Sequence, residues 1–562
     1  MNISVREWFK TGSPWVWMNA GAVAICIIMV IGLLGLIAVR GLSHFWPADV
    51  IQGTYTQNGE TRSIAGEVVE TSEVLTKQLV EAGINISEDK EFSTRHLLKI
   101  GNRDVYGSDF TWILEDFFSN QSQPEMLFTA ERREWGNLYG YLRTIKESGT
   151  EIARHDGNDK SAEYLSLWDN LESRIQRALD IREDILQIEK HEIGSINYEL
   201  ERLRLKERSL QLKNVTEAAP FAEIEQRRKE LDDEYEGLQQ RLLDLYTEIN
   251  RDSITAEVAN GKVVEIQIAK IVRAFRPNDM SVAQKSLHYI AKIWEFVSDD
   301  PREANTEGGI FPAIFGTVMM VMLMSLLVTP FGVVAAVYLR EYAKQGFVTR
   351  VIRIAVNNLA GVPSIVYGVF GLGFFVYFLG GNIDDLFFPE AKPAPTFGTP
   401  GLMWASLTLA LLTVPVVIVA TEEGLSRIPR AVREGSLALG ATKFETLMKV
   451  VLPMASPAMM TGVILAIARA AGEVAPLMLV GVVKLAPSLP LDGNYPFIHL
   501  DQKFMHLGFH IFDVGFQSPN VEAARPLVYA TALLLVAVIA LLNMSAIAIR
   551  NHLREKYKAL EM

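Results

Sequence analysis

The chain has 562 residues, of which 49% are hydrophobic, and a formal net charge of −12. It is too long for a single core, too apolar for an ordinary soluble protein and too charged for a protein that lies wholly in the membrane. The acidic excess lies in residues 41–310, between two apolar parts that are weakly basic. This distribution predicts a water-exposed domain inserted into a membrane protein. The single cysteine, Cys26, excludes an internal disulfide.

The N-terminal part carries the first apolar run, residues 18–39, which Arg6 and Lys10 precede. The run is longer than the core of a signal peptide, and no small-x-small cleavage site follows it. We therefore expect a short cytoplasmic N-terminus, residues 1–17, and an uncleaved first transmembrane helix, residues 18–39.

Residues 40–305 are expected to form a domain outside the membrane that contains a helical hairpin. Along residues 165–250, apolar side chains recur at alternating spacings of three and four. The second half of this stripe consists of Leu231, Tyr235, Leu238, Leu242, Leu245 and Ile249. Asn214 and Pro220 mark a reversal between the two halves. The pattern predicts an antiparallel coiled-coil hairpin.

Strand-like segments flank the predicted hairpin. Asn58 and Gly59 separate two alternating runs, which is typical of a β-hairpin. Residues 95–107 and 261–275 are further strand candidates, so the inserted domain is expected to be α+β. It contains no recognisable catalytic constellation or metal-ligand spacing. Its role is either that of a stabilising spacer or that of a docking surface for a soluble partner, and the residues leave both open.

Five further apolar runs of spanning length follow. They lie near residues 311–338, 355–379, 401–420, 455–483 and 526–549. Lysine and arginine cluster in the loops 340–353 and 421–453 and in the C-terminal tail, whereas the loop 380–400 is acidic. By the positive-inside rule both termini face the cytoplasm and residues 40–305 lie in the periplasm. The glycine-rich run 355–379 is also consistent with a re-entrant segment.

The cytoplasmic loop 422–453 is predicted to form two short helices joined at a glycine. Gly440 suits the left-handed conformation that ends a helix. Thr442 is followed three residues later by Glu445, the capping-box pattern that begins a helix, and Pro453 is expected to close the segment. Such an elbow at a membrane surface is suited to fit a groove on another protein.

The same loop resembles the EAA loop of ABC importer permeases. The matching residues are Glu434, Gly440, Val450, Leu452 and Pro453, while Gly435 and Ser436 stand where two alanines are usual. The segments “TEGGIFPAIFGTV”, “NNLAGVPSIVYGVFGLGFF” and “ARAAGEVAPLMLVG” further resemble the phosphate-importer permeases of the PstA type. The resemblance covers residues 306–562 and, weakly, the first apolar run. Residues 40–305 depart from the family pattern.

The resemblance implies an α-helical membrane subunit with six transmembrane helices that is itself not an enzyme. Its EAA loop would couple to an ATP-binding subunit, which holds ATP and Mg²⁺. This chain has no G-x-x-x-x-G-K-[S/T] loop and is expected to carry no cofactor. A second related permease subunit and a periplasmic phosphate-binding protein would complete the assembly in the bacterial inner membrane. The residues expected to couple are Arg433, Glu434, Leu437, Gly440, Ala441, Thr442, Phe444 and Pro453.

Arg469 and Glu473 lie in an otherwise apolar run. Four residues apart, they are expected on one helix face, and charges of this kind usually mark a wet path through a bundle. A guanidinium binds phosphate oxygens bidentately, and a competing carboxylate would help release. We expect Arg469 to contact phosphate, with Ser364 and Tyr367 as additional hydroxyl donors. The alternatives are a self-neutralising structural pair and two packing contacts.

Two other functions remain open from the residues alone. An ectodomain with a coiled coil favours a membrane sensor or scaffold, although few residues follow Arg550 to serve as an output domain. The third candidate is an ABC permease for a different oxyanion. Co-purification with an ATPase separates transport from sensing, and a flux assay identifies the substrate.

Overall fold

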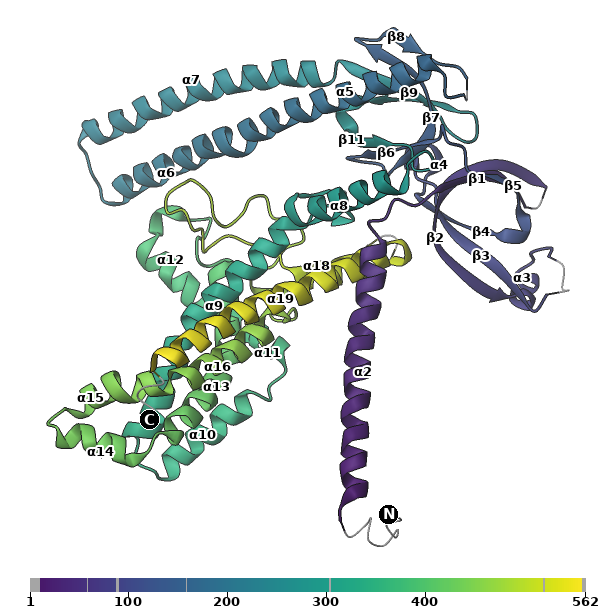
Figure 1. The fold of residues 1–562 in the computed structure, drawn as a ribbon. Helices are drawn as coiled ribbons and strands as arrows, with labels where there is room; N and C mark the ends of the chain where they lie inside the picture. Colours follow the sequence, from purple (N-terminus) through teal and green to yellow (C-terminus); the bar gives the residue numbers. More distant parts are fainter. Residues whose placement is uncertain are drawn as a thin grey trace.

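The structure, a computed structural model, describes residues 11–57, 59–86, 90–157, 159–302, 305–518 and 521–557. It consists of a helical membrane part and a mixed α/β insert that separates the first membrane helix from the others (Figure 1). Arg6, Lys10 and Asn58, on which predictions above depend, lie outside the described residues.

Among the described residues, six helical runs are long and apolar enough to cross a membrane, as predicted. The first three are α2 (Ser13–Ser43), α9 (Phe311–Val337) with η5 (Tyr338–Tyr342), and α11 (Ser364–Phe370) with η6 (Gly371–Gly380) and α12 (Gly381–Phe387). The others are α13 (Leu402–Arg427), α15 (Lys443–Thr446) with η8 (Leu447–Val451) and α16 (Leu452–Ala471), and α19 (Val521–Tyr557). Shorter helices between them are α10 (Phe347–Leu359), η7 (Pro389–Ala391), α14 (Arg430–Ala438), α17 (Leu477–Val480), α18 (Leu507–Phe512) and η9 (Asp513–Gln517).

Two of the predicted spans are misplaced. The run 355–379 is divided, because α10 ends before Pro363 and the span begins at Ser364. At 24 residues this span is about 36 Å long, which is sufficient to cross a hydrocarbon core rather than re-enter it. The span predicted at residues 455–483 is also wrong, because the helix begins at Lys443 and ends at Ala471. Pro453 does not close the elbow, because the helix continues through it after the π-helical segment η8.

Helix α13 lies at the centre of the membrane part and packs against both α9 and α16. Small residues permit this close approach. A Cβ atom on Gly332 would come within 2.6 Å of Val417 Cγ1. A Cβ atom on Gly462 would come within 2.7 Å of Ala420 Cβ. Because lipid gives membrane helices no hydrophobic reason to associate, such close contacts hold the bundle together.

The insert contains two antiparallel sheets, more strand structure than the sequence predicted. The first has the order β4-β3-β2-β1-β5, from β1 (Val50–Gln57), β2 (Glu60–Leu75), β3 (Phe92–Lys99), β4 (Phe110–Leu114) and β5 (Phe118–Ser122). The second has the order β10-β9-β7-β6-β11 with β8 beside β7, from β6 (Phe128–Arg132), β7 (Leu138–Glu147), β8 (Thr150–Arg154), β9 (Asp252–Glu257), β10 (Val263–Gln267) and β11 (Ile271–Phe275). The predicted turn at Gly59 is confirmed, since its φ is 82° and Gln57 pairs with Glu60 across it.

Between β8 and β9 the chain forms the predicted helical hairpin (Figure 1). One arm is α5 (Ala162–Leu186), η2 (Gln187–Glu192) and α6 (Ile193–Leu212), and the other is α7 (Ala218–Ile249). The chain reverses at Asn214, whose φ is 53°. At the base, Trp168 of α5 packs edge-on against Phe128 of the second sheet. The pairing of two antiparallel helices is confirmed, whereas a coiled-coil seam remains a prediction because Tyr235 of the stripe is exposed.

Helix α6 of the hairpin contacts the membrane part. The Tyr198 hydroxyl of α6 donates a hydrogen bond to the carbonyl of Tyr495. The Tyr198 ring also lies 5.8 Å from the ring of His499. Helix α6 further contacts η7. The hairpin thus reaches from the insert to the loop that joins α17 to α18.

The insert returns to the membrane through α8 (Val282–Ser298) and the short pair β12 (Pro301–Arg302) and β13 (Glu307–Gly308), which leads into α9. The domain boundary predicted between residues 305 and 306 falls inside this pair. The C-terminal end of α2 meets α19 close by, where a Cβ atom on Gly41 would lie 2.8 Å from the Ala530 nitrogen. The first span therefore depends on a glycine for its contact with the last.

Replacing Gly41 by leucine is expected to force α2 away from α19. Inserting a side chain into a close contact typically costs about 1–3 kcal/mol, so the melting temperature of the purified chain in detergent should fall. Gly35→Leu is the matched control, because nothing lies within 4 Å of a Cβ atom there. Equal melting temperatures for the two variants would contradict this role of Gly41.

Candidate functional site

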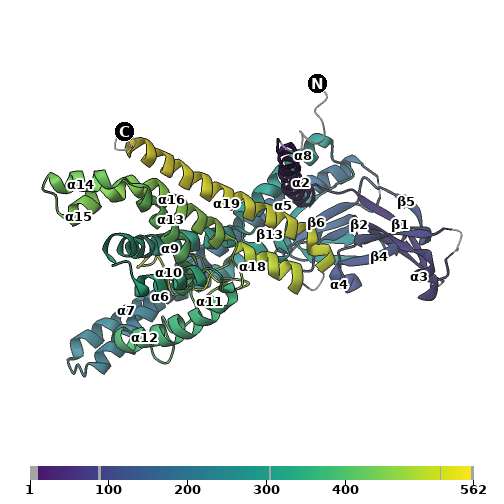
Figure 2. The same cartoon turned by 90° about the horizontal axis from the view of Figure 1, so that it is seen from below.

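The loop between α13 and α16 forms the elbow that the sequence predicts, and it lies at the end of the molecule farthest from the two sheets (Figures 1 and 2). Gly440 joins its two helices with a φ of 88°, a conformation that side chains rarely adopt. Thr442 Oγ1 accepts a hydrogen bond from the Glu445 amide at 3.2 Å, and the Glu445 carboxylate accepts one from the Thr442 amide at 3.0 Å. The predicted capping box is therefore confirmed.

The tip of the elbow presents apolar side chains to solvent. Leu439 is 91% exposed and Phe444 is 63% exposed, with Leu437 and Met448 also exposed nearby. Glu434 is exposed on α14, whereas Ala441 is half-buried. Leu437 and Phe444 were predicted from the sequence, whereas Leu439 and Met448 were not. The sequence did contain a signal for the exposure of Leu439. This residue lies directly before the left-handed Gly440, where the chain turns away from its own helix. Exposed apolar groups of this kind mark a contact surface.

Arg433, which we expected to contact a partner, is turned toward its own chain. Its guanidinium donates hydrogen bonds to the carbonyls of Ile428 at 2.7 Å and Leu425 at 2.8 Å. It also forms an ion pair with Glu341 of η5 at 2.9 Å. Arg433 therefore holds α14 against the ends of α9 and α13, and its effect on a partner would be exerted through the position of the elbow.

Arg469 and Glu473 lie at the opposite end of the same helical run. The helix ends at Ala471, so the two residues do not share a helix face as expected. They are nevertheless paired, with 3.6 Å between Arg469 Nε and Glu473 Oε1. Their side chains are 34% and 21% exposed, so the pair is partly buried and keeps some contact with solvent. The pair thus lies at the end of the helical run, where it is partly accessible.

The structure brings α11 against the segment that follows Glu473. A Cβ atom on Gly368 would lie 2.7 Å from Pro476 Cα. The neighbouring Tyr367 is buried, and its hydroxyl donates to the Leu359 carbonyl at 2.5 Å. Its single O–H is thus engaged by its own chain. Ser364 is half-buried at the first turn of α11, and its hydroxyl has no hydrogen-bond partner among the residues that the structure describes.

The membrane part is similar to known proteins. The family described as binding-protein-dependent transport system inner membrane component matches residues 328–559. The phosphate transport system permease protein PstA 1 of Mycobacterium tuberculosis is 34% identical over 244 residues, which are 43% of this chain and 71% of that protein. The chain belongs to the PstA family of ABC importer permeases. The PstA protein of Yersinia pestis is 31% identical over 251 residues, 45% of this chain and 75% of that protein.

Among solved structures, a chain from the inward-facing MetNI methionine ABC transporter is similar at 18% identity and a TM-score of 0.33, covering 47% of this chain and 98% of that chain. The family match begins within α9, so the whole insert lies outside it. In this PstA-family chain, the elbow at 430–446 and the Arg469–Glu473 pair both lie inside the matched region. These two places are therefore the candidate sites of the permease part.

Arg433→Gln is expected to loosen the elbow, because it removes the ion pair with Glu341 and leaves two carbonyls without their donor. Chymotrypsin should then cut faster after the exposed Leu439 and Phe444, as measured by mass spectrometry of timed digests. Arg430→Gln is the control, since Arg430 is exposed on the same helix and has no ion pair among the described residues. Unchanged cleavage in Arg433→Gln would show that the elbow is held by other contacts.

Proposed function

We propose that the chain is the transmembrane subunit of an ATP-driven importer for inorganic phosphate and forms half of its translocation pathway. The substrate is inferred from one observation: the chain is 34% identical to a protein named as a phosphate transport system permease. The Arg469–Glu473 pair supports it, because a partly accessible guanidinium matches the geometry and charge of a phosphate oxyanion.

The continuous helical run from Lys443 to Ala471 supplies the mechanical link. An ATP-binding subunit, with ATP and Mg²⁺ bound to it, takes the exposed tip around Leu439 and Phe444 into a groove. Closure of that subunit moves the elbow. At 29 residues the run is about 43 Å long, and hydrogen bonds along its backbone let it move as one body. Arg469 at its far end therefore shifts when the elbow shifts.

Binding and release of phosphate follow from competition for one guanidinium. In one state Arg469 pairs with Glu473 at 3.6 Å; in the other, phosphate replaces the carboxylate. Passage requires transient binding, and a carboxylate that can reclaim the arginine prevents tight retention. Ser364, half-buried at the start of α11, supplies a further hydroxyl donor. Tyr367 acts through packing, because its hydroxyl is already bound to Leu359.

The chain is placed in the bacterial inner membrane with both termini and the elbow in the cytoplasm. Residues 40–305 then lie in the periplasm, and the hairpin, whose stripe pairs as a coiled coil, stands over the outer loops. A second, related permease subunit covers the exposed side of the Arg469–Glu473 pair. A periplasmic phosphate-binding protein delivers substrate to the outer face, on which the hairpin offers one contact surface.

Two alternatives have specific support. The inserted hairpin favours a sensor or scaffold, and Arg469 alone is compatible with another oxyanion. Labelled phosphate uptake, challenged separately with excess arsenate and sulfate, distinguishes all three functions. A phosphate importer takes up labelled phosphate and is inhibited by arsenate but not by sulfate; a permease for a different oxyanion such as sulfate takes up that oxyanion when it is labelled instead, and a sensor takes up neither label.

Arg469→Gln is expected to lower phosphate uptake at least about tenfold, because charge-assisted hydrogen bonds contribute about 1.5–3 kcal/mol. Uptake is measured in cells whose only phosphate importer contains this chain, with assembly checked by co-purification of the ATP-binding subunit. Arg350→Gln, an exposed arginine on α10, should transport normally. Full uptake by assembled Arg469→Gln would reduce the pair to a structural role.

Leu439→Glu is expected to abolish co-purification of the ATP-binding subunit, because a charge then replaces the most exposed apolar group of the tip. The control is Leu243→Glu, which places the same charge at an exposed leucine on α7. Pull-down of the tagged chain quantifies the bound ATPase. Equal recovery with both variants would exclude the tip as the contact.

A further inference from the structure

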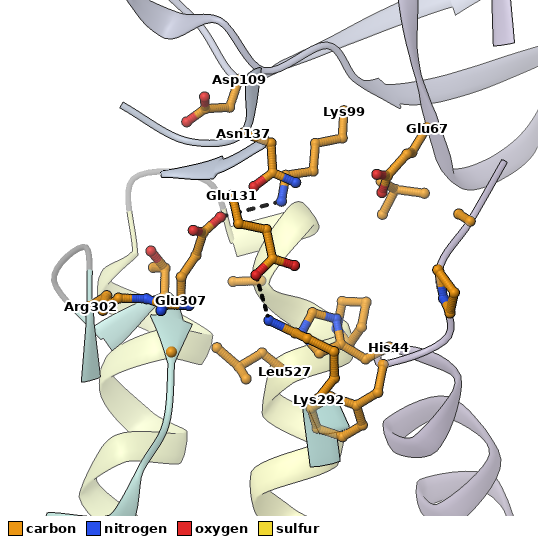
Figure 3. Close-up of a pocket in the computed structure, with 18 of the residues that line it drawn as sticks. His44, Glu67, Lys99, Asp109, Glu131, Asn137, Lys292, Arg302, Glu307 and Leu527 are labelled. Carbon is orange, nitrogen blue, oxygen red and sulfur yellow. Dashed lines mark hydrogen bonds and ion pairs between the residues drawn. The ribbon is translucent and has the colours of Figure 1, made fainter. Parts of the chain in front are cut away.

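A cavity of about 760 Å³ lies where the insert meets the outer ends of the first and last spans (Figure 3). Its walls come from the end of α2, from β2, β3 and β6, from α8 and β13, and from the start of α19. Most of these elements belong to the insert, outside the family match, so neither the elbow nor the Arg469–Glu473 pair explains the cavity. Its volume is in the usual range for small-molecule sites.

Most charged groups of the cavity neutralise one another. Lys99 pairs with Glu307 at 3.3 Å, and Lys292 pairs with Glu131 at 3.0 Å (Figure 3). Burial opposes ionisation of Glu131, but Lys292 and the neighbouring arginines outweigh it and lower its pKa to about 2. Both lysines therefore have their own counter-ions. Burial lowers the pKa of His44 to about 4, so this ring is neutral at pH 7 and adds no charge.

Arg133 differs from these two lysines. It lines the cavity, and among the described residues its guanidinium has no carboxylate partner; its Nε is buried without a hydrogen bond. The charges that act on it are those of Arg182 and Arg302, which are also cations. Burial and then these two neighbours lower the pKa of Arg133 to about 10. A charged group in such surroundings is costly unless an anion compensates it.

Arg302 stands beside Arg133 with one unused donor. Its guanidinium pairs with Glu295 at 2.6 Å, while its Nε is buried without a partner. The opposite wall is apolar, with Phe45 from the end of α2, Phe296 from α8 and Leu527 from α19. The cavity therefore combines a side in the insert that carries both charges, and on which Arg133 has no counter-ion, with an apolar side at the membrane helices.

We propose that this cavity binds a phosphoryl oxyanion, held by Arg133 with Arg302 beside it. A guanidinium offers paired N–H donors that match two oxygens of a phosphoryl group, and it remains charged at every physiological pH. The same chemistry is presented by inorganic phosphate from the solvent and by the phosphate of a phospholipid head group whose acyl chains follow the apolar wall. The inference does not rest on the proposed transport function.

The test uses the full chain carrying Arg469→Gln, so that the proposed pathway site does not contribute. One arm measures equilibrium binding of radiolabelled orthophosphate to the delipidated chain in maltoside detergent. The other counts phospholipids retained per chain by native mass spectrometry before delipidation. Each arm compares Arg133→Gln with Arg208→Gln, a matched change at an exposed arginine on α6 outside the cavity.

Arg133→Gln is expected to weaken binding at least about tenfold in one arm, while Arg208→Gln leaves both arms unchanged. Loss of orthophosphate binding identifies a site for the free anion, and loss of retained phospholipid identifies a head-group site. Arg133→Lys keeps the charge without the planar fork and should lose part of the binding; it also replaces the glutamine variant if that variant fails to fold. Equal results for the Arg133 variants and Arg208→Gln in both arms would overturn the proposal.

Discussion

Close approach of α13 to α9 and α16 is the constraint on which the membrane part depends. In lipid, every backbone polar group must be satisfied within the protein, and helices associate through small residues rather than through the hydrophobic effect. Polar side chains of α13 follow the same requirement, since Thr408 and Thr413 donate to carbonyls of their own helix. Because α13 is held in this way, the ends of α9 and α13 contact Arg433 and keep the elbow in place. Arg469 lies on α16, at the other end of the helical run that begins at the elbow. The two candidate sites are therefore placed by one packing arrangement.

Features decided by a few neighbouring residues were predictable from the sequence. The left-handed Gly440, the Thr442–Glu445 capping box and the turn at Gly59 each depend on local backbone chemistry. The number of spans was predictable for a similar reason, because hydropathy averages over about twenty residues. Span limits were not, since a run such as 455–483 remains apolar after its helix has ended. Most strands of the insert also escaped prediction, because they are short and pair with partners far away along the chain.

The roles of individual charged residues were the least predictable. Arg433 lies in a motif that suggested an outward contact, yet its ion-pair partner Glu341 is 92 residues away in sequence. Arg469 and Glu473 were placed near one another correctly, but only the observed end of α16 shows that they lie at the end of the helical run, where they are partly accessible. The cavity around Arg133 had no sequence signal, because its walls come from elements spread between α2 and α19. These contacts could not be predicted because the residues that form them are far apart in the sequence, not because the interactions are weak.

The two chain connections between the insert and the membrane part lie close together. The chain leaves the membrane after α2 and returns before α9, and the rings of Phe45 and Phe296 at these two points lie 5.0 Å apart in one buried cluster. A loop whose ends already touch can lengthen at little entropic cost, because closure entropy grows only with the logarithm of loop length. The first two spans can therefore be joined by a whole domain as readily as by a short loop, because the spacing of their ends is the same in both cases.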